Sequence, residues 1–120
     1  MKEFKAIVAK SVTDKQNSCF TQASLQQLAG KNLSLSVMTD FKTEDIIGTV
    51  IELEFKDSSL IATIRLNKDY DLKDKVFRVW GKINSSHKEK DRNIINDWGI
   101  LGLGMIDKGR DVYPEEKNEI

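Results

Sequence analysis

The stretch IIGTVIELEFKDSSLIATIRL, residues 46–66, decides the fold because it is two alternating strands around a short polar turn. A turn at Asp57 and Ser58 sets apolar residues of the first strand opposite apolar residues of the second strand on one face of the hairpin. The expected pairs are Phe55 with Leu60, Leu53 with Ala62 and Ile51 with Ile64. A slip of one residue would bury Glu52 and Glu54, so this register is strongly favoured. Because glycine suits two-residue turns better than serine, a four-residue loop over residues 56–59 remains an alternative.

Alternating patterns continue on both sides of this hairpin and predict further strands. The expected strands cover residues 4–9, 33–38, 75–83 and 99–107. Between the last two lies the polar stretch NSSHKEKDR, residues 84–92, which we expect to form a loop. The three glycines of the strand GILGLGMID indicate a close backbone approach or a bulge.

One segment favours a helix. Thr21 can cap a helix over residues 22–29, with Leu25 and Leu28 facing inward and Gly30 ending it. The order of elements predicts an α+β fold. We expect a small, mainly antiparallel curved sheet or partly closed β-barrel, with one short helix near the N-terminus.

Length and composition limit the classes of protein. The 120 residues allow one domain, residues 1–113, followed by a flexible acidic tail over residues 114–120. Nineteen basic and 19 acidic side chains cancel, which argues against a general polyanion binder. Neither a membrane span nor a secretory signal is apparent, so we expect a cytoplasmic protein. One cysteine and one histidine exclude an internal disulfide and a Cys/His zinc site, and no cofactor is predicted.

Signals for an enzyme are weak. His87 lies in a charged stretch and is better explained as a solvated side chain than as a catalytic base. Cys19 has no nearby base and is better explained as a small, partly buried residue than as a nucleophile. Glu52 and Glu54 are expected to be solvated on an outer strand face. The segment GILGLG lacks the lysine and the following helix of a phosphate-binding loop.

One strand face has binding character. Arg78, Trp80 and Lys82 alternate along a strand, so two cations flank one indole, and Arg65 could extend this face from the hairpin. Such a face can stack a base and hold phosphates, or anchor a protein interface. The alternative is a tryptophan covered by a loop, with the lysine and arginine stems packed over it.

Short motifs along most of the chain share an order with a known family. They are FTQASL at residues 20–25, LSLSVMTD at 33–40, IGTV at 47–50 continuing to Leu66, FRVWGKI at 77–83, IND at 95–97 and ILGLGMID at 100–107, with Pro114 after them. Together they resemble the phage prohead (capsid maturation) protease family, whose fold is shared with the herpesvirus assemblins.

The sequence departs from this family at the positions that would carry catalysis. The resemblance places the histidine of the family at Thr39, its serine nucleophile at Arg78 and the acidic residue of the closing strand at Gly102. None of these residues can perform the corresponding role. No serine lies between Ser59 and Ser85, so a shifted alignment does not restore the nucleophile. The resemblance therefore implies a non-catalytic relative.

Three hypotheses follow. The first is a phage or prophage structural protein of the host cytoplasm or the virion, which binds capsid or scaffold components or itself. The second is a small nucleic-acid-binding or host-interfering module that uses Arg65, Arg78, Trp80 and Lys82. The third, a residual hydrolase using Cys19, His87 or a carboxylate pair, has the least support.

Overall fold

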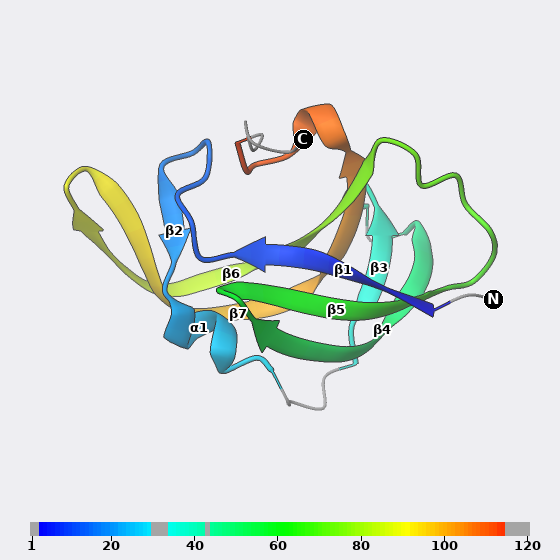
Figure 1. Ribbon diagram of the computed structural model, residues 1–120, viewed down its shortest axis with the longest axis horizontal. Coiled ribbons are helices and arrows are strands. Elements are labelled where there is room, and N and C mark those ends of the chain that lie inside the picture. Colours follow the sequence, from blue (N-terminus) through cyan, green and yellow to red (C-terminus); the bar gives the residue numbers. More distant parts are fainter. Residues whose placement is uncertain (1–2, 30–33, 43, 115–120) are drawn as a thin grey trace.

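The computed structural model describes residues 3–29, 34–42 and 44–114. Its elements in chain order are β1 (Glu3–Lys10), β2 (Ser18–Phe20), α1 (Gln22–Gln26), β3 (Ser36–Thr39), β4 (Ile46–Lys56), β5 (Ser59–Leu66), β6 (Lys75–Glu89), β7 (Arg92–Asp107) and the 3₁₀ helix η1 (Lys108–Arg110). The molecule is mostly β. The strands of the described residues form one strongly curled sheet, a half-barrel, with α1 at one end (Figure 1).

The sheet is organised around β7. Its order is β1-β5-β4-β3-β7, and β6 and β2 also pair with β7. Because β6 follows β7 along almost its whole length, β2 and β3 must share the opposite edge of β7. These two pairings are parallel, whereas the others are antiparallel. The expectation of a mainly antiparallel, curved, barrel-like sheet is confirmed.

The curl brings β1 and β6 together along a line that we call the seam. No ladder pairing joins these two strands in the described part of the chain. The rings of Phe4 and Phe77 meet across the seam, with their centroids 5.4 Å apart. Arg78 Nη1 donates a hydrogen bond across it to the carbonyl oxygen of Ile7, at 2.6 Å. Side chains, rather than a strand ladder, therefore close the half-barrel here.

The central hairpin has the predicted turn and most of the predicted register. Asp57 and Ser58 have φ angles of 53° and 61°, as a two-residue type I′ turn requires, so the four-residue loop is not formed. Phe55 faces Leu60 and Leu53 faces Ala62 as expected.

The prediction that Ile51 faces Ile64 is wrong. A β-bulge between Val50 and Glu52 leaves Ile51 without a partner and sets Val50 opposite Ile64. Val50 is therefore buried, while Ile51 is 45% exposed. The extra residue of a bulge reverses the alternation of side chains beyond it, and the sequence pattern alone did not locate it.

We expected the polar stretch over residues 84–92 to form a loop. This expectation is wrong, because the stretch continues the two strands β6 and β7 and contains the turn between them. β6 and β7 pair as far as Glu89 and Arg92, and the turn between them consists of Lys90 and Asp91, both with positive φ. We call residues 81–98 of this hairpin the arm. It projects from one end of the half-barrel (Figure 1).

The helix is shorter than predicted. Thr21 caps it as expected, since its Oγ1 accepts a hydrogen bond from the backbone N–H of Ser24 at 3.1 Å. The helix ends at Gln26, and turns follow it as far as Ala29. Leu25 and Leu28 both point into the core, with 0% and 4% exposure. The expected stop at Gly30 lies outside the described residues.

One hydrophobic cluster fills the concave side of the sheet and draws on every strand and on α1. Tyr113 is the last buried residue of the described chain. The tail predicted over residues 114–120 lies outside the described residues except for Pro114. Among the described helices, none is long and apolar enough to cross a bilayer.

Candidate functional site

Arg78, the first cation of the predicted binding face, is buried in a network of internal contacts. Its Nε and Nη2 groups donate to the two carboxylate oxygens of Asp111, each at 2.7 Å. Its Nη1 group donates to the carbonyl oxygens of Ile7 and Phe77, at 2.6 and 2.9 Å. The residue is 8% exposed. Arg78 therefore ties β1 and β6 to the C-terminal segment rather than facing a ligand.

Tyr113 completes this arrangement. Its ring lies beside the guanidinium of Arg78, 5.1 Å from centroid to Cζ. Its hydroxyl accepts from the backbone N–H of Lys10 at 2.9 Å and donates to the carbonyl oxygen of Lys10 at 3.3 Å. We call Arg78, Asp111 and Tyr113 the seam network.

The ionisation of the seam network follows from its contacts. Burial raises the pKa of Tyr113 to about 12, so its hydroxyl stays protonated at neutral pH. Burial would also raise the pKa of Asp111, but the hydrogen bonds and charge of Arg78 outweigh that effect and lower it. Arg78 and Asp111 are thus a charged pair in a site that water barely reaches.

Trp80 lies over the glycines of β7. It pairs with Gly102, and a Cβ atom at Gly102 would be 2.8 Å from the indole nitrogen of Trp80 and 2.6 Å from Cε of Met38. A Cβ at Gly104 would be 2.4 Å from the ring of Phe41. At these two positions side chains lie against the bare backbone of β7. The expected close backbone approach is at Gly99, whose carbonyl oxygen would be 2.0 Å from a Cβ atom on Gly81, and a register shift marks a bulge between Ile100 and Gly102. Trp80 is half-buried, and its Nε1 has no hydrogen-bond partner among the described residues.

The four residues of the predicted binding face do not form one surface. Arg65 is on β5, which pairs with β1 and β4 rather than with β6, and it forms an ion pair with Glu3. Lys82 is exposed at the base of the arm. Arg78 is buried against Asp111, so only Trp80 and Lys82 remain of the predicted face on β6. The predicted pair of cations flanking an indole is therefore not present.

The three positions at which the resemblance placed catalytic residues lie on adjacent strands. Thr39 pairs with Met105 on β7, Gly102 is three residues before Met105, and Arg78 pairs with Gly104. Arg78 is committed to Asp111, and Gly102 is covered by Trp80. These positions thus hold a structural ion pair and a packing contact.

His87 lies on the arm with two side-chain partners. Its Nδ1 is 2.8 Å from Oδ1 of Asn96, and its Nε2 is 3.4 Å from a carboxylate oxygen of Glu89. These contacts raise the pKa of His87, Asn96 first and Glu89 second. The side chain is half exposed.

The remaining candidates for catalysis are also dispersed. Cys19 is half-buried on β2, and its Sγ lies 3.5 Å from the carbonyl oxygen of Phe20. Glu54 forms an ion pair with Lys5 at 2.9 Å, while Glu52 is exposed. In the described part of the chain, no group of three His, Cys, Asp or Glu side chains is placed to hold a metal ion.

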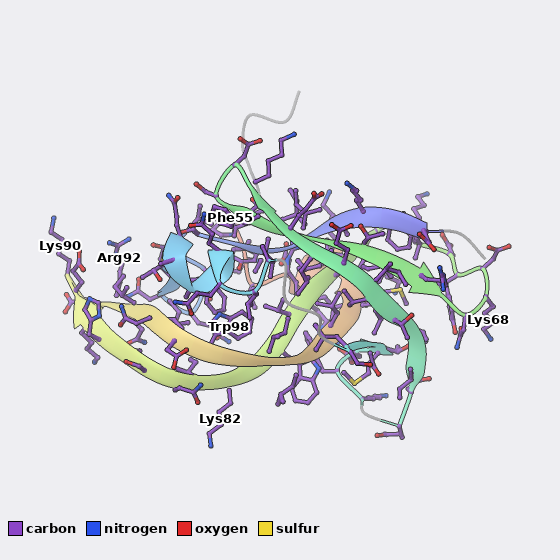
Figure 2. All side chains as sticks on the ribbon, turned by 90° about the horizontal axis from the view of Figure 1, so that it is seen from below. Phe55, Lys68, Lys82, Lys90, Arg92 and Trp98 are labelled. Atoms are coloured by element: carbon purple, nitrogen blue, oxygen red, sulfur yellow. The ribbon has the colours of Figure 1, made fainter. Side chains whose placement is uncertain are left out.

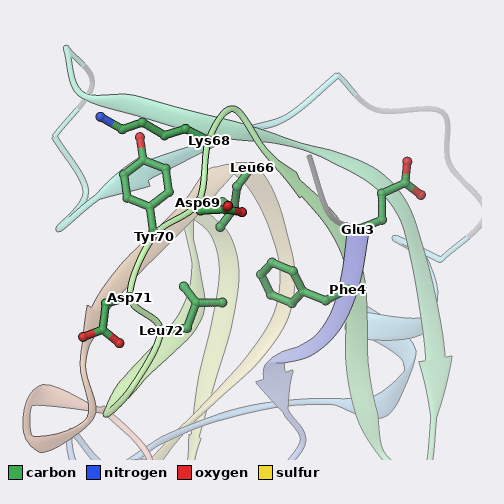
Figure 3. Close-up of a pocket in the computed structure, with 8 residues that line it drawn as sticks. All are labelled: Glu3, Phe4, Leu66, Lys68, Asp69, Tyr70, Asp71 and Leu72. Atoms are coloured by element: carbon green, nitrogen blue, oxygen red, sulfur yellow. The ribbon is translucent and has the colours of Figure 1, made fainter.

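A cavity of about 450 Å³ opens between the start of β1, the end of β5 and the segment that follows it (Figure 3). Phe4 and Leu72 point toward one another across the hollow. Its other lining residues are Glu3, Leu66, Lys68, Asp69, Tyr70 and Asp71. Tyr70 donates to Asn67, and Lys68 lies 5.3 Å from the centroid of the Tyr70 ring. The walls offer apolar surface and scattered charges, without a nucleophile paired to a base.

The arm contains the longest run of consecutive exposed residues in the described part of the chain. Residues 81–91 are all exposed. Figure 2 shows Trp98 on the concave side of the arm, toward α1, and Lys82 on its convex side. The contacts of the arm with the body are made from the β7 side: Arg92 Nη1 donates to Thr13 Oγ1 at 3.0 Å, and Asn93 N donates to the carbonyl oxygen of Asn17 at 2.9 Å.

Comparisons of the chain with protein-family models, with curated proteins and with solved structures found no match.

Sequence reasoning missed the seam network and the arm. Asp111 and Tyr113 stand immediately before Pro114, beyond the last predicted strand, and no role was predicted for them. The signal available was the run Asp-Val-Tyr-Pro, in which one aromatic and one apolar residue interrupt a polar stretch. Residues 84–92 of the arm were missed because they are polar throughout, so no alternation marks them as strand.

Proposed function

We propose that this protein is a non-catalytic assembly protein that acts through protein–protein contacts. Under the resemblance drawn from the sequence, its setting is a phage or prophage and its partners are capsid or scaffold components or a second copy. The contact element in this proposal is the arm. The observation that carries the proposal is its strand β6 from Gly81 to Glu89, whose residues are all exposed and whose outer edge has no strand partner among the described residues. An exposed strand edge without a partner is a template for pairing with another chain.

The charge of the arm favours a protein partner over nucleic acid. Lys82, Lys88, Lys90 and Arg92 are accompanied by Glu89, Asp91 and Asp97. A nucleic-acid-binding ribbon gains affinity by neutralising phosphates, and alternating acidic side chains oppose this. The alternative of a nucleic-acid-binding or host-interfering module also loses Arg78, which is held by Asp111. Mixed charges suit the polar rim of a protein interface.

The test is co-purification of a tagged chain from cells in which phage particles assemble, with mass spectrometry of the captured proteins. We expect capsid or scaffold proteins in the eluate, and their loss when residues 88–91 are changed to Ala-Ala-Asn-Gly. This change removes charges of the arm and sets Asn-Gly at the two positive-φ positions of the turn. Thermal unfolding would verify that the variant is folded. Capture of nucleic acid alone, dissociated by added salt, would instead support the alternative and overturn the proposal.

A further inference from the structure

The outer edge of β6 within the arm lacks a backbone partner. Among the described residues, β6 from Gly81 to Glu89 pairs only with β7. The β1–β2 segment and β2 itself occupy the other side of the arm, along β7. An edge of nine exposed residues presents unpaired N–H and C=O groups to solvent, which is the arrangement that a further strand extends.

The register of the arm shows which face each residue of this edge occupies. Ile83 pairs with Trp98 and Ser86 pairs with Ile95, and both partners belong to the core cluster. Ile83 and Ser86 therefore both point to the concave side, although they are three residues apart. The register shift between Ile83 and Ser85 explains this, because Asn84 is the extra residue of a bulge.

Lys82 and Glu89 consequently lie on the same, convex face. Lys82 precedes the inward Ile83, and Glu89 follows Ser86 by three residues. The contact between His87 and Glu89 confirms that these two share a face. In a regular strand two residues seven positions apart would point to opposite faces, and the bulge removes this difference.

We propose that a second copy of the chain pairs with this edge, antiparallel and about a two-fold axis at Ser86; the proposal rests on the assembly function above and names its partner. A two-fold axis perpendicular to a sheet leaves both faces unchanged, so residues opposite one another must share a face within their own strand. With the axis at Ser86, Lys82 of each copy faces Glu89 of the other. Ile83 then faces Lys88, and Ser85 faces His87.

Charge selects this register among its neighbours. An axis at Ser85 sets Lys82 against His87, whose pKa is raised, and an axis at His87 sets Glu89 against Ser85. Only the axis at Ser86 gives two opposite-charge pairs, one at each end of the paired segment. Such cross-strand pairs stabilise a sheet, whereas like charges directly opposite destabilise it. The interface is isologous and closed, so pairing stops at the dimer.

The experiment measures the solution mass of the full chain by light scattering across a concentration series at moderate salt. We expect a dimer, and a dissociation constant that rises about tenfold or more in Lys82→Glu and in Glu89→Lys, since two pairs are reversed in each variant. The double variant Lys82→Glu/Glu89→Lys restores the pairs and should dimerise like the original chain. Lys90→Glu, in the turn beyond the paired segment, is the matched control and should change nothing.

A cross-link tests the register independently of affinity. In a Cys19→Ala background, Ser86→Cys places two thiols opposite one another across the axis, and mild oxidation should yield a covalent dimer. Lys90→Cys is the control, because the proposed register separates its two copies by roughly 26 Å along the strands. A monomer at all concentrations, or a dimer that ignores the charge reversals and does not cross-link at Ser86, overturns the proposal. A monomer that still captures capsid or scaffold proteins leaves the assembly function standing without this interface.

Discussion

The seam and the arm share strand β6 but satisfy its polar groups in opposite ways. At the seam, β6 lies against β1 without a ladder, and Arg78 supplies the hydrogen bonds from its side chain to Ile7 and Asp111. In the arm, β6 keeps its ladder to β7 and leaves the other edge to solvent. Polar residues thus close the fold at one end of β6 and face solvent at the other.

Removing the guanidinium at the seam should have the largest effect. Arg78→Met leaves the carboxylate of Asp111 buried without its partner, and loss of one member of a buried pair costs about 3–5 kcal/mol of the free energy of unfolding. Chemical denaturation measures it. The control is Arg110→Met, which removes an exposed pair with Asp40 and should cost less than about 1 kcal/mol. Equal losses in the two variants would contradict the structural role assigned to Arg78.

The junction between body and arm offers a second comparison, between Gly81 and Gly99. A Cβ atom at Gly81 would be 2.0 Å from the carbonyl oxygen of Gly99, whereas one at Gly99 meets nothing within 4 Å. Gly81→Ala should therefore destabilise the protein by about 1–3 kcal/mol, because backbone must move. Gly99→Ala should be close to neutral. Thermal unfolding of both variants separates them, and similar melting temperatures would show that the strands do not approach so closely there.

These regions also differ in how well the sequence predicted them. The hairpin of β4 and β5 was predicted closely because its apolar alternation and its turn agree on one register. The bulge at Ile51 was not predicted, because it shifts the strand register by one residue while the sequence around it still alternates. Residues 84–92 were not predicted as strand, because backbone hydrogen bonds pair them while their side chains are polar and show no apolar alternation. Charge and aromaticity identified Arg78 as special, but its partner Asp111 is 33 residues away and only the fold brings them together.

The pH dependence of stability should distinguish buried from exposed carboxylates. The pKa of Asp111 is lowered in the folded chain. Its pair with Arg78 therefore stabilises the fold at pH values above the ordinary pKa of the carboxyl group, near 3.8. That stability is lost as the pH falls through the lowered pKa. Asp111→Asn should flatten the fall in melting temperature between neutral and acidic pH. Asp107→Asn, which removes an exposed pair with Lys75, should alter that curve less, and the reverse ranking would be evidence against a buried pair.

The smallest expected effect is a change in the pKa of His87 on the arm. Hydrogen bonds to Asn96 and Glu89 raise the pKa of His87 above 6.5, which means that the protonated ring is favoured in the folded arm. Any contribution to stability is present below 6.5 and disappears as the pH rises through the folded value. NMR titration of the imidazole measures this pKa directly, and Asn96→Ala should move it down toward 6.5 without unfolding the body. If the pKa of His87 is the same in both chains, strands β6 and β7 do not hold the side chains of His87 and Asn96 together.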